Sequence, residues 1–119
     1  MLTRRAAAAR ATDPEPALFD VVYELLQRTA REIQHEDGSP CNAGNSYRDL
    51  YDLGAREAVE KSVLKSSTSG FGKVGDAGRL DLSYEWLVLR PDLTFGPEVK
   101  RRAWERLDRF LATQQVVAR

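Results

Sequence analysis

Between residues 18 and 33, apolar residues recur every three or four positions, which is the spacing of one face of an α-helix. The pattern predicts an amphipathic helix over residues 14–36. Pro14 and Pro16 suit its first turn, where their missing N–H groups are not needed, and Asp13 is a suitable N-cap. The predicted face consists of Leu18, Val21, Val22, Leu25, Leu26, Ala30 and Ile33.

A second helical pattern follows a loop rich in Gly, Asn and Pro. Ser46 is a suitable cap, and Asp49 stands three residues later, where its side chain can reach back to the cap. We expect this helix to run from Ser46 to about Lys65. Small residues near its middle, such as Gly54 and Ala58, would let another helix approach closely.

The period changes to two over residues 80–89, where apolar and polar residues alternate before the run turns wholly apolar. Leu80, Leu82, Tyr84, Trp86 and Val88 share one face of this pattern. Alternation of this kind predicts a β-strand, half-buried at its start and fully buried at its end. Its edges need a partner, which would be residues 73–74, residues 93–95 or another chain.

A last helix is expected over residues 97–114, with Pro97 at its first position and Glu98 near its positive end. Its predicted face consists of Val99, Ala103, Leu107, Phe110 and Leu111, with Trp104 beside them. The elements together predict a single small α+β domain, with two N-terminal helices, a strand or hairpin region at about 80–95 and a C-terminal helix. A mostly helical bundle with a short hairpin is the alternative.

The composition is that of an ordinary globular protein. The 119 residues carry 18 basic and 18 acidic side chains, and this balance excludes a generally basic nucleic-acid binder. No apolar run approaches the roughly 20 residues of a membrane-spanning helix. Cys41 is the sole cysteine, which excludes an intramolecular disulfide and favours an intracellular, cytoplasmic location.

The first residues differ from the rest of the chain. Arg4, Arg5 and Arg10 stand among five alanines, and no acidic residue precedes Asp13. This composition resembles an organelle transit peptide, which would place the protein in a mitochondrion or plastid. It also fits a frayed basic arm over residues 1–13 that would need a partner to order it. The globular domain would then span residues 14–115.

A Ser- and Gly-rich stretch over residues 66–79 predicts a long flexible loop. Gly70, Gly72, Lys73 and Gly75 within it fit a G-x-G-x-x-G pattern, whose N–H groups can bind phosphate. A dinucleotide site requires this pattern after a strand and before a helix, whereas here it follows a helix and precedes the predicted strand. We therefore expect a linker, with a weak ligand site as the alternative.

Candidate catalytic chemistry is sparse. His35 and Cys41 are the only reactive pair, and one of each makes a poor metal site. We expect no catalytic group, metal or cofactor. The basic side chains Arg101, Arg102 and Arg106 could bind nucleic acid, but interleaved acids favour a solvated, self-paired face.

The sequence therefore favours a non-enzymatic interaction protein, an accessory or adaptor subunit of a larger assembly. We expect it to bind a protein partner or a second copy by strand addition through residues 80–89, together with the N-terminal arm. The interface candidates are Leu82, Tyr84, Trp86, Val88, Arg4, Arg5 and Arg10. The alternatives are a phosphate- or ligand-binding domain using residues 70–75, and a nucleic-acid-associated accessory protein.

Overall fold

The computed structural model describes residues 3–33, 44–65 and 74–117, and this part of the chain consists of helices and turns without a strand. The predicted α+β class is therefore wrong, and the fold is all-helical. The chain divides into two compact units, Met1–Lys61 and Ser62–Arg119. The predicted extent of one domain, residues 14–115, stays a prediction, because this division describes packing and not independent folding.

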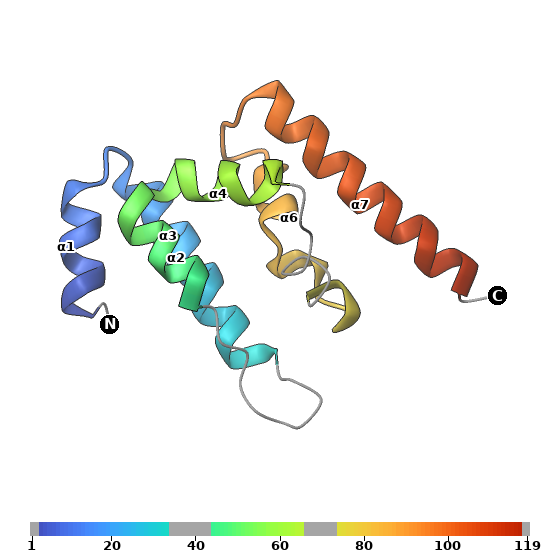
Figure 1. The fold of residues 1–119 in the computed structure, drawn as a ribbon, viewed down its shortest axis with the longest axis horizontal. Helices are drawn as coiled ribbons and strands as arrows, with labels where there is room; N and C mark the ends of the chain where they lie inside the picture. Colours follow the sequence, from blue (N-terminus) through green and yellow to red (C-terminus); the bar gives the residue numbers. More distant parts are fainter. Residues whose placement is uncertain (1–2, 34–43, 66–73, 118–119) are drawn as a thin grey trace. The chain divides into compact units, whose positions relative to one another are not determined.

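The first unit is built from α1 (Arg4–Thr12), α2 (Pro16–Glu32), α3 (Gly44–Leu53) and most of α4 (Ala55–Leu64). Helices α1, α2 and α3 pack against one another (Figure 1). The apolar face predicted for α2 supplies much of the core, although α2 begins at Pro16 and ends at Glu32, inside the predicted range. The buried core of the first unit includes Leu18, Phe19, Val22, Leu25, Leu26, Ile33, Leu50 and Val59.

Gly54 separates α3 from α4, so the single helix predicted over 46–65 is two helices. Its φ of +89° lies in the left-handed region, which ends a helix and which residues with a Cβ rarely adopt. The Gly54 N–H still donates to the carbonyl of Leu50 at 3.1 Å, which closes the last turn of α3. Helix α4 then starts at once, with the Ala55 N–H donating to the carboxylate of Asp13 at 2.8 Å.

Residues Arg4–Thr12 form helix α1 and are not a frayed arm. Thr3 caps the helix, because its hydroxyl accepts from the Ala6 N–H at 3.1 Å. The side chain of Ala6 is fully buried against the rest of the unit, while most of the other side chains of α1 are exposed. Helix α1 thus belongs to the folded first unit.

The second unit contains the end of α4, a helical turn at residues 74–76, η1 (Leu80–Leu82), α6 (Tyr84–Val88) and α7 (Pro97–Val117). Helix α6 packs against α7. As predicted, α7 begins at Pro97. The apolar core of this unit is formed by Val63, Val74, Leu82, Leu87, Val88, Phe95, Val99, Ala103 and Leu107.

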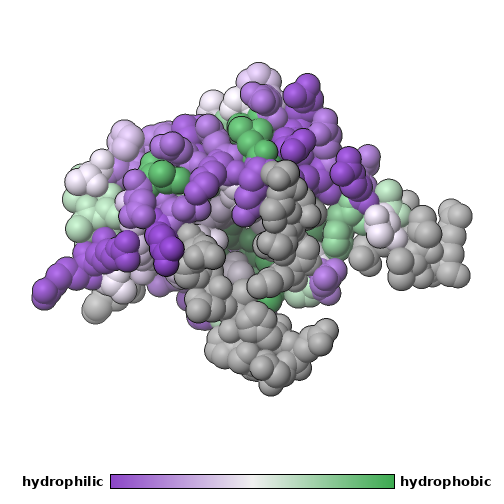
Figure 2. Space-filling model, in the orientation of Figure 1, coloured by the Kyte–Doolittle hydropathy of each residue, from purple (hydrophilic) through white to green (hydrophobic). Residues whose placement is uncertain are grey.

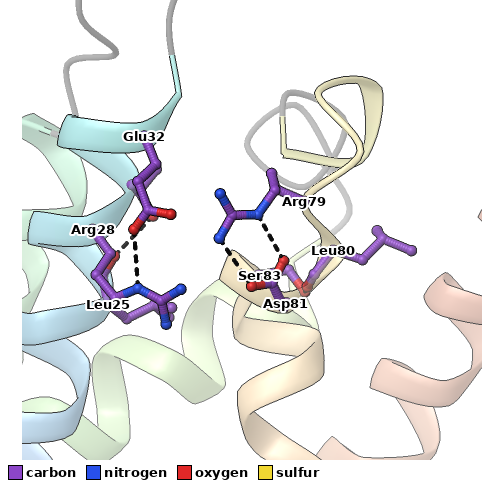
Figure 3. A network of polar contacts seen from close by, with 8 residues as sticks. Leu25, Arg28, Glu32, Arg79, Leu80, Asp81 and Ser83 are labelled. Carbon is purple, nitrogen blue, oxygen red and sulfur yellow. Dashed lines mark hydrogen bonds and ion pairs between the residues drawn. The ribbon is translucent and has the colours of Figure 1, made fainter.

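The strand predicted over residues 80–89 is wrong, because these residues form η1 and α6. Ser83, which lies beside Leu80 in Figure 3, decides the local structure. Its hydroxyl donates to the Leu80 carbonyl at 2.7 Å and accepts from the Trp86 N–H at 3.0 Å. The buried side chains are Leu82 and Ser83 before α6 and Glu85, Leu87 and Val88 within it, so burial does not alternate along the segment. The charged Glu85 is buried and the apolar Trp86 is exposed, which is the reverse of what the alternating pattern predicts. Residues 93–95, the possible second strand, are also not extended into a sheet.

Candidate functional site

Helix α7 exposes two large apolar side chains. Trp104 is 63% exposed and Leu111 is 49% exposed. They stand seven residues apart, so they share one side of the helix about 10 Å apart along its axis. The sequence pattern had placed both with the core-facing residues of this helix.

The side of α7 that packs into the second unit is different. Val99, Ala103 and Leu107 are buried there. At roughly 100° per residue, Trp104 lies about 100° and Leu111 about 80° around the helix from the centre of that buried side. The apolar surface of α7 is therefore wider than the side that packs, and Trp104 and Leu111 form its exposed edge. The positions of these residues around the helix follow from their spacing in the sequence. The sequence does not show which part of the apolar surface a neighbouring element covers.

Charged residues flank Trp104. Lys100 and Arg101 precede it by four and three residues and are exposed, and Asp108 follows it by four. On a helix these spacings make neighbours. Lys100, Arg101, Trp104, Asp108 and Leu111 are called the outer face of α7 below.

The cations of the outer face differ from other arginines of the second unit. Arg79 pairs with Asp81 at 3.1 Å (Figure 3), and Arg90 pairs with Asp92 at 2.6 Å. Within the part of the chain that the structure describes, neither Lys100 nor Arg101 has an acidic side chain in ion-pair distance. Their charges are thus directed to solvent beside an exposed tryptophan.

A buried ion pair fixes α7 in its unit. Nη1 of Arg106 lies 2.7 Å from Oε2 of Glu85, and the two side chains are only 7% and 4% exposed. The Arg106 guanidinium also donates to the carbonyls of Ser62, at 3.0 Å, and Lys65. It thereby binds α6 and the C-terminal end of α4 to one position on α7. The sequence pattern predicts a solvated basic face for Arg106, and this prediction is wrong because the side chain is buried.

The predicted interface residues of 80–89 separate in the structure. Leu82 and Val88 are core residues, and Tyr84 is half-buried. Only Trp86, at 49% exposure on α6, is accessible to a partner. Strand addition through these residues is excluded by their helical conformation.

Two arginines of the N-terminal segment have partners inside the first unit. Nε of Arg10 donates to Asp20 at 2.7 Å, which lowers the pKa of that carboxyl and raises the pKa of the guanidinium. Arg5 lies 5.0 Å from the ring centroid of Tyr51 and 3.7 Å from Asp52. Arg4 is exposed. These contacts hold α1 in place.

Aromatic rings form a row beneath α1. Tyr23 stacks on Phe19 with centroids 6.0 Å apart, Tyr47 meets Tyr23 edge-on at 5.8 Å, and Tyr51 follows at 6.2 Å. Burial raises the pKa of both Tyr47 and Tyr51, and the neighbouring Tyr23 raises it further. The row joins α2 to α3 and reaches Arg5 of α1.

The glycine pattern lies mostly outside the described residues, because only Gly75 of its members is described. A Cβ on Gly75 would lie 2.6 Å from the ring of Phe110, so this glycine permits a close contact with α7. Gly70, Gly72 and Lys73, like His35 and Cys41, lie outside the described ranges. Among the residues that are described, no group of His, Cys, Asp or Glu could hold a metal ion, and no helix is long and apolar enough to cross a membrane.

No family model, curated protein or solved structure matches the chain. On the side drawn in Figure 2, hydrophilic residues predominate and hydrophobic ones form small separate patches. Against such a surface, an exposed tryptophan and leucine on one side of one helix form the candidate site.

Proposed function

We propose that this chain is a non-enzymatic interaction protein, an accessory or adaptor subunit of a larger assembly, and that it binds a protein partner through the outer face of α7. The observation that carries the proposal is the joint exposure of Trp104 and Leu111 on one side of that helix. Tryptophan is among the residues that contribute most to binding energy at protein interfaces. Apolar anchors two turns apart are the usual contacts of a helix that lies in a partner's groove.

The position of this face on a fixed helix supports the proposal. The buried Glu85–Arg106 pair and the core residues of α7 hold the helix backbone in its unit. A partner then binds a surface that needs little ordering, which lowers the entropic cost of association. We do not propose binding through a flexible N-terminal arm, because residues Arg4–Thr12 form helix α1 of the first unit.

The experiment is site-specific photo-crosslinking in the organism that makes the protein. A photo-reactive phenylalanine analogue is placed at position 104, at position 111 and, as a matched exposed control in the same unit, at position 92. We expect one protein to be captured from 104 and 111 and not from 92. Its purified form should bind the wild-type chain and lose at least tenfold in affinity for Trp104→Ala. Equal capture from all three positions, or binding unchanged by Trp104→Ala, would refute the proposal.

We also propose an intracellular, cytoplasmic site of action, which the single cysteine of the sequence supports. Targeting to a mitochondrion or plastid would require removal of the N-terminal segment, and that segment includes α1 with its buried Ala6. Mass determination of the protein purified from its own cells tests this point. A chain that still carries α1 agrees with the proposal, whereas a chain cleaved near residue 13 contradicts it.

A further inference from the structure

The charges of the outer face are unevenly distributed along α7. Its N-terminal half carries Lys100 and Arg101 on either side of Trp104, and its C-terminal half carries Asp108 beside Leu111. At roughly 100° per residue, Lys100 lies about 40° to one side of Trp104 and Arg101 about 60° to the other. Any partner that covers the indole must therefore pass close to both cations.

Burying these cations under a partner has a desolvation cost unless carboxylates meet them. We infer that the partner is a protein with an apolar groove edged by Asp or Glu side chains, and that the acidic edge lies at the Trp104 end. This inference rests on the proposed function and adds the chemistry and the orientation of the partner. The groove would accept Trp104 and Leu111 in two pockets about 10 Å apart.

The position of Asp108 indicates at which end of the outer face the partner is acidic. It lies one turn beyond Trp104 on the same edge of the outer face as Arg101. An acidic groove along the whole length would repel Asp108, so the acidic edge ends near Trp104. Opposite charges aligned in this way fix the register of a complex and speed its association.

A zero-length carbodiimide crosslink tests the inference, because this reagent joins an amine to a carboxylate only when the two are in ion-pair contact. We expect the protein captured from position 104 to form an amide with Lys100 through an Asp or Glu side chain. Lys100→Arg keeps the charge, so it should abolish the crosslink while leaving affinity within about twofold. Lys100→Glu with Arg101→Glu should weaken binding at least tenfold at low salt, and less at high salt.

The outcomes separate the inference from the proposed function. Capture from position 104 without a crosslink at Lys100, together with affinity unchanged by the charge reversal, would overturn the acidic groove and leave the interaction function in place. Loss of capture after nuclease treatment would show that the cations bind nucleic acid, and would also overturn it. Absence of any protein captured from position 104 would instead refute the proposed function. Circular dichroism of each variant confirms folding, which these exposed substitutions should not disturb.

Discussion

Glu85 of α6 and Arg106 of α7 form a buried ion pair, with Oε2 of Glu85 2.7 Å from Nη1 of Arg106. The guanidinium also donates to the main-chain oxygens of Ser62 and Lys65. Each charge is therefore compensated inside the second unit, and removal of one partner leaves the other buried. This arrangement is the main polar connection between α6, α7 and the end of α4.

Replacing Arg106 should be strongly destabilising. Arg106→Met leaves the Glu85 carboxylate and two carbonyls without their donor, and we expect the free energy of unfolding to fall by about 3–5 kcal/mol. Glu85→Gln should cost less, because the guanidinium keeps its two carbonyl acceptors. Urea unfolding of the two single variants and the double variant measures the coupling. A double-variant loss equal to the sum of the single losses would contradict a direct interaction.

Gly75 should tolerate no larger side chain. In Gly75→Ala the new Cβ would lie 2.6 Å from the Phe110 ring, so the ring or the helical turn must move. We expect a loss of about 1–3 kcal/mol, typical of overpacking. Gly96→Ala is the matched control, because no atom lies within 4 Å of its Cβ position.

Thermal unfolding of the two alanine variants tests this packing role. Adding Phe110→Leu to Gly75→Ala should recover part of the loss, because the smaller side chain leaves room for the Cβ. Equal unfolding temperatures for Gly75→Ala and Gly96→Ala would show that the contact with Phe110 does not constrain this glycine.

Asp13 should stabilise two helix starts at once. Its Oδ1 accepts from the Glu15 N–H and its Oδ2 from the Ala55 N–H, both at 2.8 Å. Asp13→Ala removes both bonds, and we expect a loss of about 0.5–2 kcal/mol, the range measured for N-caps. Asp20→Ala is the control, because Asp20 forms an exposed pair with Arg10. Chemical denaturation should show the smaller effect for the control, and the reverse order would refute the capping role.

The sequence predicted helices where the buried face is continuous and apolar. The buried sides of α2 and α7 are mostly apolar, and Pro16 and Pro97 stand at the first positions of the two helices. The prediction for segment 80–89 was wrong because the charged Glu85 occupies a buried position and the apolar Trp86 an exposed one. The partner that makes this burial possible, Arg106, lies 21 residues away in sequence. No local pattern contains that information.

The candidate site was only partly predictable for the same reason. Trp104 was counted as part of a core-facing stripe, because an apolar residue on a helix edge gives no sign of whether a neighbour covers it. Trp86 was chosen as an interface residue for its place on a strand, and it is exposed for a different reason, as part of a short helix. The division of α3 from α4 at Gly54 depends on Asp13, which is distant in sequence and caps the next helix.

Alkaline titration should detect the aromatic row of the first unit. Burial and neighbouring tyrosines raise the pKa of Tyr47 and Tyr51 above the ordinary value of 10.0. A raised folded-state pKa means that the associated stability is fully present below about pH 10 and is lost as the pH rises through the folded value. Tyrosinate absorbance should therefore show a late step that vanishes in urea and shrinks in Tyr47→Phe. A titration identical in the folded and unfolded chains would contradict the burial of these rings.

Acid should weaken the connection between α2 and α4. Arg56 donates to both carboxylate oxygens of Glu15, at 2.7 and 2.9 Å, and these bonds lower the Glu15 pKa below its ordinary value of 4.5. A lowered folded-state pKa means that the stability from this pair is present above pH 4.5 and is lost as the pH falls through the folded value. Because both side chains are more than one-third exposed, solvent limits the effect to about 0.2–1 kcal/mol.

The acid effect is measured as the difference between urea midpoints at neutral pH and at about pH 3, where the carboxylate is largely protonated when unfolded. Asp20 and Asp92 have pKa values lowered by Arg10 and Arg90, so the wild-type chain loses stability from three pairs together. Glu15→Gln removes the contribution of one pair and should make the pH dependence of the urea midpoint shallower. The variant should be destabilised relative to the wild type more at neutral pH than at about pH 3. A variant whose midpoints differ from the wild type equally at both pH values would show that the Glu15 charge does not hold α4 to α2.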